Sequence, residues 1–244
     1  MELPFEPGRR RRIYLMRHGD AAYIDAEGRM AADPRQVPLS ARGRREAAAM
    51  GELLAAAKFD RAVCSGLPRT VETAELVLRD KRLPLERVPE LEEVRGGARG
   101  SGRPIVPRDV AYSIGEAKSP GGRFLGGESF LELELRVMGA VERLVAQLDW
   151  TQLLLVAHGG VNRVVLGWAL GAGLHSAPHM EQDSGCVNVI DLDHDPEGKL
   201  IRTLVRALNV TAADPAKHEH WLTTLERQGK ELESLLARAQ GRAS

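Results

Sequence analysis

Short apolar runs recur along this chain, and three of them end at residues with polar or charged side chains. Residues 13–16 lead into Arg17 and His18, residues 62–64 lead into a Ser-Gly-Leu-Pro-Arg turn, and residues 153–157 lead into His158. Short apolar runs bounded by turn signals are typical of buried strands. The pattern therefore predicts three strands whose ends carry candidate chemistry.

Helical periodicity follows each of these predicted strands. We expect Ser40 to cap a helix over residues 41–57, Pro68 to begin a helix over residues 68–78, and Ser129 to open a third helix with a capping box. The expected inward faces comprise Ala47, Met50, Leu53 and Leu54 in the first helix, and Leu131, Leu135, Met138, Val145 and Leu148 in the third. Alternating strands and helices predict an α/β fold, a three-layer α/β/α sandwich around a mostly parallel central sheet.

The chain divides into three parts by composition. Residues 1–12 read as a flexible basic tail, residues 13–210 as one domain, and residues 211–244 as a helical extension at the C-terminus. Within the domain, residues 95–127 are rich in glycine and proline, and we expect a loop that covers the active site. Between positions 95 and 123 there are six basic residues against two acids. Either this loop selects substrates with a second anionic group, or these charges are scattered over a solvated surface; the sequence favours neither alternative.

Composition excludes several classes of protein. Lys plus Arg equals Asp plus Glu at 34 each, so no overall charge favours nucleic acid or a membrane surface. No run approaches the roughly 20 apolar residues that span a bilayer. The two cysteines, Cys64 and Cys186, both fall in expected strands and make a disulfide framework unexpected. We expect a cytoplasmic protein, monomeric or homodimeric, without nucleic-acid or membrane partners.

The predicted strand ends gather a set of residues suited to phosphoryl transfer. In an open parallel sheet, ligands bind beyond the carboxyl ends of the strands, where Arg17, His18, Arg69 and His158 would meet. Arginine forks hold phosphate oxygens, a neutral imidazole can attack phosphorus, and a second, charged imidazole can stabilise the transition state. We also expect Gly159 to let the backbone approach the phosphate at a helix N-terminus.

Six short motifs, in this order, resemble the histidine phosphatase (phosphoglycerate mutase-like) superfamily over residues 12–192. They are Leu15-Met16-Arg17-His18-Gly19, Pro38-Leu39-Ser40 with Gly43, Ser65-Gly66-Leu67-Pro68-Arg69-Thr70, Leu91-Glu92-Glu93, Gly127-Glu128-Ser129, and Val156-Ala157-His158-Gly159-Gly160. The resemblance implies that His18 is the phosphorylated nucleophile and that Arg17, Arg69 and His158 bind the phosphate. It also implies Glu93 as proton donor, with Glu90 and Glu92 as neighbouring alternatives, and no metal or organic cofactor.

These inferences favour a phosphatase that hydrolyses phosphomonoesters of small molecules or of phosphoproteins. A mutase, which returns the phosphoryl group to a substrate, and a non-catalytic module that binds phosphorylated ligands are the alternatives. A metal-dependent hydrolase needs a set of ligands; His175 and His179 have suitable spacing, but Pro178 argues against a regular helix there. The run Arg-His-Gly-Asp-Ala departs from the Arg-His-Gly-Glu-Thr of many members, which leaves sugar-phosphate specificity open.

Overall fold

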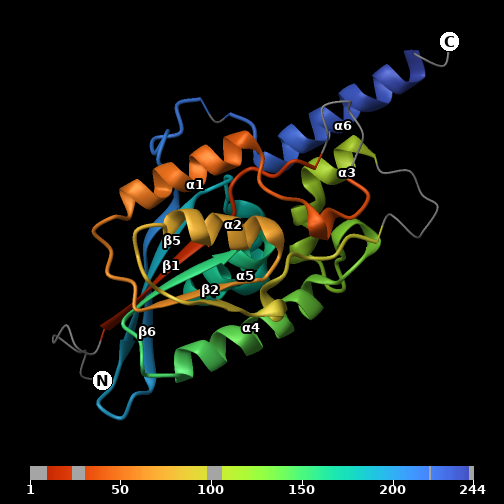
Figure 1. The fold of residues 1–244 in the computed structure, drawn as a ribbon. Coiled ribbons are helices and arrows are strands. Elements are labelled where there is room, and N and C mark those ends of the chain that lie inside the picture. The colour runs from red at the N-terminus through yellow and green to blue at the C-terminus, as the bar shows by residue number, and fades with distance from the viewer. Residues whose placement is uncertain (1–9, 24–30, 98–105, 220, 242–244) are drawn as a thin grey trace.

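A six-stranded mixed sheet forms the centre of the computed structural model, which describes residues 10–23, 31–97, 106–219 and 221–241 (Figure 1). The strands are β1 (Arg10–Arg17), β2 (Arg61–Cys64), β3 (Leu85–Arg87), β4 (Gln152–Ala157), β5 (Val187–His194) and β6 (Leu200–Val210). Their order is β3-β2-β4-β1-β5-β6. The first four in this order are parallel, β5 is antiparallel to β1, and β5 and β6 form an antiparallel hairpin.

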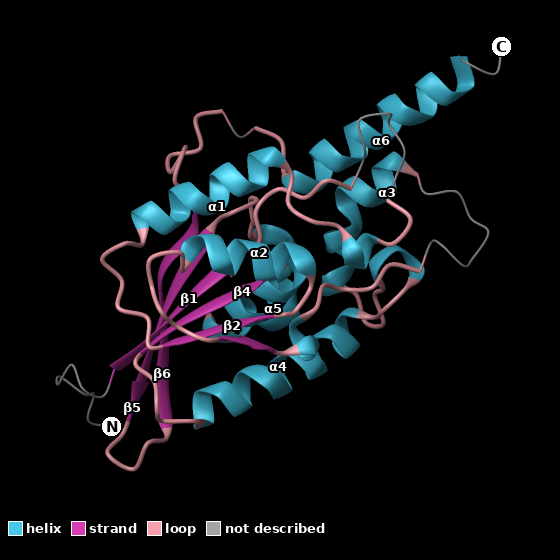
Figure 2. Cartoon of the chain, viewed as in Figure 1, coloured by secondary structure: helices cyan, strands magenta, loops and turns pink. Residues whose placement is uncertain are grey.

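Helices cover both faces of the sheet and form the expected three layers (Figure 2). They are α1 (Ala41–Leu53), α2 (Pro68–Val77), α3 (Pro107–Tyr112), α4 (Phe130–Ala146), α5 (Gly159–Ala169) and α6 (Thr224–Gly241). Alternate residues of a strand point to opposite faces, so Ile13 and Leu15 of β1 pack in the core under α4 and α5, while Met16 packs in the core under α1 and α2. The predicted α/β sandwich is confirmed.

The local signals at the helix starts are present in the structure. The Ser40 hydroxyl accepts a hydrogen bond from the Gly43 amide at 3.0 Å, Pro68 is the first residue of α2, and Ser129 and Glu132 form a capping box. The helix ends differ from expectation, because α1 stops at Leu53, short of residue 57. The residue that caps a helix N-terminus can be recognised from its own side chain. The last residue of a helix depends on packing with other elements, which the local sequence does not determine.

The predicted inward face of the α4 region is wrong for three of its five residues, while Val145 is buried and Met138 packs against the core. Leu131, Leu135 and Leu148 are exposed, and the buried stripe comprises Phe130, Leu133, Val137, Ala140, Val141, Leu144 and Val145. Apolar residues occur on two neighbouring stripes of this helix, so periodicity alone could not choose between them. In α1 the prediction holds for Ala47, Met50 and Leu54, but Leu53 is exposed.

The basic tail is shorter than the sequence indicated. β1 begins at Arg10, so residues 10–12 belong to the sheet, while residues 1–9 lie outside the described residues. Arg10 donates to Asp193 and Arg12 to Asp191, both at 2.6 Å between Nε and Oδ1. The two aspartates lie on the antiparallel neighbour β5 and are almost fully buried, so the guanidinium groups satisfy carboxylates that could not stay unpaired.

Two segments outside the sheet contribute residues near the carboxyl ends of β1 and β4. In the region expected as a loop, residues 98–105 lie outside the described residues, and the rest contains α3 and the 3₁₀ helices Ser113–Lys118 and Phe124–Gly126. The C-terminal extension includes α6, which begins at Thr224 and packs against α3 (Figure 1). In the described part of the chain, no helix has the length and apolar character needed to cross a membrane.

Candidate active site

The parallel strands bring the predicted residues together at their carboxyl ends. Arg17 of β1 lies in register with Ala157 of β4, and the His18 amide donates to the Ala157 carbonyl at 3.1 Å. The rings of His18 and His158 have centroids 5.1 Å apart. Both side chains are almost fully buried. Sequence positions far apart in the chain therefore lie side by side at the carboxyl ends of the strands.

His18 is held as a neutral imidazole with one nitrogen directed at a cation. Its Nδ1 lies 2.6 Å from the Gly19 carbonyl oxygen and therefore carries the proton that it donates there. Its Nε2 accepts from Arg69 Nε at 3.2 Å, so this nitrogen presents a lone pair. Burial lowers the pKa of His18 well below its ordinary value, and the charges of Arg69 and Arg17 lower it further.

His158 is oriented by a chain of hydroxyl groups. Its Nε2 lies 2.8 Å from Ser65 Oγ, which in turn lies 2.9 Å from Thr70 Oγ1. Its Nδ1 lies 3.4 Å from Arg69 Nη2, a donor, so the proton of the neutral ring belongs on Nε2. Burial and then Arg69 lower the pKa of His158 well below its ordinary value, which favours the neutral ring in this structure; the charged ring expected in the transition state stays a prediction.

Arg17 and Arg69 are buried cations with different hydrogen-bond partners, and of the two Arg17 lines the pocket that Glu93 also lines. Arg17 donates through Nη1 to the Gln182 carbonyl at 2.5 Å, and its buried Nε has no hydrogen-bond partner among the described residues. Arg69 donates to the Pro34 carbonyl at 3.0 Å while it contacts both histidines. A buried donor without a partner is costly, so Arg17 retains capacity to bind an anion.

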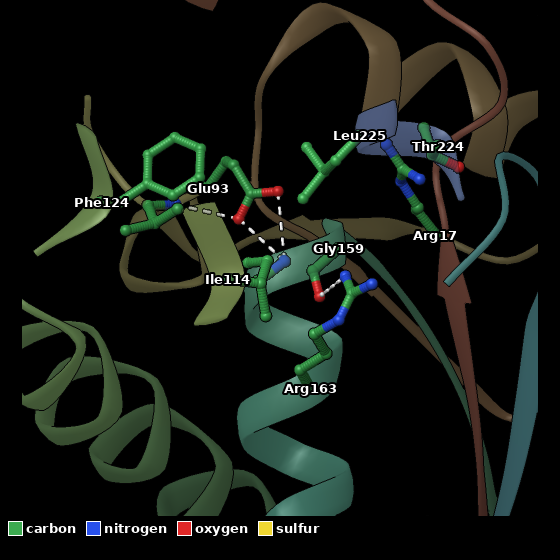
Figure 3. A pocket seen from close by; sticks show the side chains of 10 residues that line it. Arg17, Glu93, Ile114, Phe124, Gly159, Arg163, Thr224 and Leu225 are labelled. Carbon is green, nitrogen blue, oxygen red and sulfur yellow. Dashed lines mark hydrogen bonds between the residues drawn. The ribbon is translucent and has the colours of Figure 1, made fainter. Parts of the chain in front are cut away.

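The three candidate glutamates have different surroundings. Glu93 lines the pocket, and its carboxylate accepts from the Gly160 amide at 3.1 and 3.2 Å (Figure 3). Glu92 instead forms an ion pair with Arg35 at 2.6 Å. Glu90 forms an ion pair with Arg143, and neither Glu90 nor Glu92 lines the pocket.

Two glycines at the start of α5 leave space for these charged groups. A Cβ on Gly160 would lie 2.5 Å from Glu93 Oε1, closer than any real contact allows. A Cβ on Gly159 would lie 3.1 Å from Arg163 Nη1 and 3.6 Å from Arg17 Nε. The helix N-terminus therefore approaches both the carboxylate and the guanidinium groups because it carries no side chains there.

Sequence reasoning missed part of the pocket. Its wall includes Ile114 and Phe124 from the region of residues 95–127, Arg163 from α5, and Thr224 and Leu225 from the start of α6 (Figure 3). The space between these side chains, open solvent at its mouth included, is about 320 Å³. Arg163 follows Gly159 by one helical turn, a spacing that could have placed it beside the site, whereas nothing in the sequence pointed to Thr224 or Leu225.

The basic residues of the segment 95–127 do not contribute to this wall where the structure describes them. Arg95 and Arg123 are exposed, Arg108 is exposed on α3, and Arg99 and Arg103 lie outside the described residues. His175 and His179 fall in the 3₁₀ helix Gly173–His179 with Pro178 inside it. Across the described residues, no three His, Cys, Asp or Glu side chains form a group able to hold a metal ion.

Comparisons with known proteins agree on one family. The sequence profile of the histidine phosphatase superfamily (branch 1) matches residues 13–206. The adenosylcobalamin/alpha-ribazole phosphatase of Escherichia coli K12 is 31% identical over 186 residues, which cover 75% of this chain and 90% of that protein. A probable phosphoglycerate mutase GpmB of Proteus mirabilis is 26% identical over 193 residues, which cover 75% of this chain and 86% of that protein.

Solved structures with the same fold include two phosphatases. The alpha-ribazole phosphatase from Shigella flexneri superposes with a TM-score of 0.63 at 29% identity, covering 81% of this chain and 96% of that chain. A mycobacterial glucosyl-3-phosphoglycerate phosphatase, 23% identical, superposes with a TM-score of 0.65 and shares the fold over 82% of this chain and 99% of that chain.

Proposed function

Because this chain belongs to the histidine phosphatase superfamily, we propose that it hydrolyses phosphomonoesters through a phosphohistidine formed on His18. One observation carries this proposal more than any other. His18 Nε2 presents its lone pair 3.2 Å from the Arg69 guanidinium, in a site where burial and neighbouring charge keep the ring unprotonated. The proposed nucleophilic nitrogen thus lies within hydrogen-bond distance of a cation that attracts the phosphoryl group.

Arg17, Arg69, His158 and Gly159 bind the phosphoryl group in this proposal. An incoming phosphate displaces His18 Nε2 as the partner of Arg69 and takes the unpartnered Nε of Arg17. Arginine suits this role because its fork matches phosphate oxygens and it does not deprotonate. The anion also favours a proton on His158 Nδ1, which then donates to an equatorial oxygen and stabilises the charge of the transition state.

Glu93 acts as general acid and then as general base. In the first step, the N–P bond forms at His18 Nε2, the P–O bond to the alcohol breaks, and a proton on the Glu93 carboxyl passes to the departing oxygen. In the second step, Glu93 takes a proton from water, the water oxygen attacks phosphorus, and the N–P bond breaks to release inorganic phosphate. The hydrogen bonds from the Gly160 amide support this role by fixing the carboxylate at the pocket.

The test is to trap the intermediate. The protein is mixed with a ³²P-labelled ester, quenched without acid because phosphohistidine is acid-labile, digested, and the labelled peptide identified. We expect the label on His18 and none in a His18→Ala variant that remains folded by circular dichroism. Turnover of an ester with no label on that ring would contradict the proposal.

A mutase is the second candidate, because probable phosphoglycerate mutases are among the relatives. The two activities differ in the acceptor of the phosphoryl group, so inorganic phosphate release is compared with transfer to an added monophosphate. We expect release to dominate. A panel of esters should include alpha-ribazole phosphate, since the Escherichia coli relative carries that name. Binding of phosphorylated ligands without any turnover would instead support the non-catalytic module.

Retained activity in EDTA is part of the proposal, since the two arginines supply the charge neutralisation that a metal provides elsewhere. We further propose that the protein works in the cytoplasm, where its two buried thiols, Cys64 and Cys186, would stay reduced. A phosphate ester is the partner that these assignments require.

A further inference from the structure

One wall of the pocket comes from outside the part of the chain that the family profile matches. The match ends at residue 206, yet Thr224 and Leu225, the first two residues of α6, line the pocket beside Glu93. Figure 3 shows Leu225 and Glu93 extending into the same space. The C-terminal extension therefore borders the place where an acid at Glu93 would meet the departing alcohol.

Hydrogen bonds fix this wall to the core of the site. Glu181 accepts from the Thr224 amide through Oε1 and from Arg163 Nη2 through Oε2, both at 3.0 Å. Arg163 in turn donates to the Gly159 carbonyl at 3.1 Å. A second tie joins Arg227 of α6 to Asp183 at 3.3 Å. The carboxylate of Glu181 thus links the first turn of α6 to Arg163 and, through Arg163, to the N-terminus of α5.

The chemistry of this end of the pocket is mainly apolar. Four apolar side chains surround the Glu93 carboxylate there, namely Val94, Ile114, Phe124 and Leu225. Three of them come from the region between the acid and α4, and the fourth comes from α6. Ile114 and Val94 belong to the hydrophobic core, and Phe124 and Leu225 pack against it. An alcohol that leaves past Glu93 therefore meets hydrocarbon on several sides.

Charge at the same end does not favour a second anion. The guanidinium of Arg163 is paired with Glu181, which offsets its charge. Glu93 itself would repel an anionic substituent on the leaving group when ionised. From the segment 95–127, the described residues that reach the pocket are Ile114 and Phe124, both uncharged. The charge excess of that segment therefore lies away from the leaving group wherever it is described.

We propose that the C-terminal extension forms a leaving-group subsite and that Leu225 makes the enzyme select phosphomonoesters whose alcohol is uncharged and apolar. This inference rests on the phosphatase function proposed above. Leu225 contributes apolar surface to the wall beside Glu93, so it acts on specificity and not on the phosphoryl group.

The experiment uses two esters with similar phenols, 4-ethylphenyl phosphate and 4-(hydroxymethyl)phenyl phosphate, which differ by a methyl against a hydroxyl group. We expect the wild-type kcat/KM to favour the ethyl ester by about tenfold, the size of a modest apolar discrimination. Leu225→Asn should bring this ratio close to one. Leu236→Asn, on an exposed position of the same helix, should leave the ratio unchanged. If Leu225→Asn does not fold, Leu225→Ala provides the same test with a smaller apolar side chain.

The possible results separate the inference from its premise. Hydrolysis of both esters with a ratio that neither Leu225 variant changes overturns the subsite and leaves the phosphatase standing. A change of the same size in Leu236→Asn also overturns it, because the effect would then come from α6 in general. No hydrolysis of these esters or of any ester in the wider panel overturns the phosphatase and the subsite together.

Discussion

Replacement of Gly160 by alanine should separate acid catalysis from phosphate binding. The Gly160 amide holds the Glu93 carboxylate, and a Cβ at this position would lie 2.5 Å from Glu93 Oε1. Real Cβ atoms essentially never approach closer than 3.0 Å, so the carboxylate must retreat by at least 0.5 Å, the difference of these two distances. The three heavy atoms nearest to this Cβ belong to Glu93 and Val94, so we expect the histidines to keep their contacts to Arg69.

The size of the effect follows from the role of an acid. A misplacement on the order of 1 Å costs about 10²-fold in rate, and a general acid supplies roughly 10²–10⁴-fold. With ethyl phosphate, whose alkoxide needs a proton to leave, we expect Gly160→Ala to lower kcat/KM by about 10- to 100-fold. With 4-nitrophenyl phosphate, whose phenolate leaves unaided, the loss should stay below about threefold because the acid contributes little.

Stability should change little, which keeps the kinetics interpretable. Alanine is favoured over glycine in a helix by up to ~1 kcal/mol, and the clash falls on the end of a flexible side chain. Gly139→Ala in α4 is the matched control, since its Cβ would meet only Arg143 Nη1 at 3.7 Å, an ordinary contact. It should affect neither ester.

A double-mutant cycle completes the assay. If Gly160 acts through Glu93, then Gly160→Ala in a Glu93→Gln background should cost almost nothing further with ethyl phosphate. Equal losses with the two esters, or losses that add in the double variant, would refute the reasoning. Thermal unfolding of each variant shows whether the fold survives.

Three further outcomes are expected. Ser65→Ala removes the acceptor for the His158 Nε2 proton and should lower kcat/KM about tenfold, the equivalent of one lost buried hydrogen bond, without changing the unfolding temperature greatly. Glu181→Gln removes the charge that pairs with Arg163 and accepts the hydrogen bond from the first turn of α6. We therefore expect KM for 4-ethylphenyl phosphate to rise several-fold while kcat stays nearly constant. An effect on kcat alone would contradict this. Because the folded pKa of His18 and of His158 lies below the ordinary 6.5, the unfolded chain binds more protons in acid, so stability is complete above about pH 6.5 and is lost as pH falls below it. Urea midpoints at pH 7.5 and 5.5 test this, and the pH effect should shrink in His18→Asn.

The sequence could predict the strand ends but not all that surrounds them. Buried parallel strands require apolar runs, so Arg17, the Arg69 turn and His158 stand out where those runs end. The proton donor is harder, because Glu90, Glu92 and Glu93 follow one another closely. The side chains of these glutamates point in different directions because the chain forms a 3₁₀ helix at Pro89–Leu91. Contacts with distant residues hold them there, such as the ion pairs of Glu90 with Arg143 and of Glu92 with Arg35.

Long-range docking is the part that no local pattern reveals. Leu225 belongs to an amphipathic helix, and its place is fixed by contacts with distant residues, such as the hydrogen bonds from the Thr224 amide to Glu181 and from Arg227 to Asp183. The same limit explains the wrong face of α4, where Leu131 and Leu135 compete with Phe130 and Leu133. Choice between two apolar stripes depends on the partner surface, which sequence periodicity does not contain.

In the proposed mechanism, the arginines connect the electrostatics of the site to its chemistry. Arg69 and Arg17 lower the pKa of His18 beyond the effect of burial, so the groups proposed to attract phosphate would also keep the proposed attacking nitrogen unprotonated. A phosphate that takes the hydrogen bonds of Arg69 would offset this effect with its negative charge and favour protonation of the neighbouring His158. Burial of the two rings is thus compatible with the opposite roles proposed for them, because the ligand would supply the charge that distinguishes them. His18 would escape protonation through formation of the N–P bond, whereas His158 would hold a proton on the nitrogen that faces Arg69.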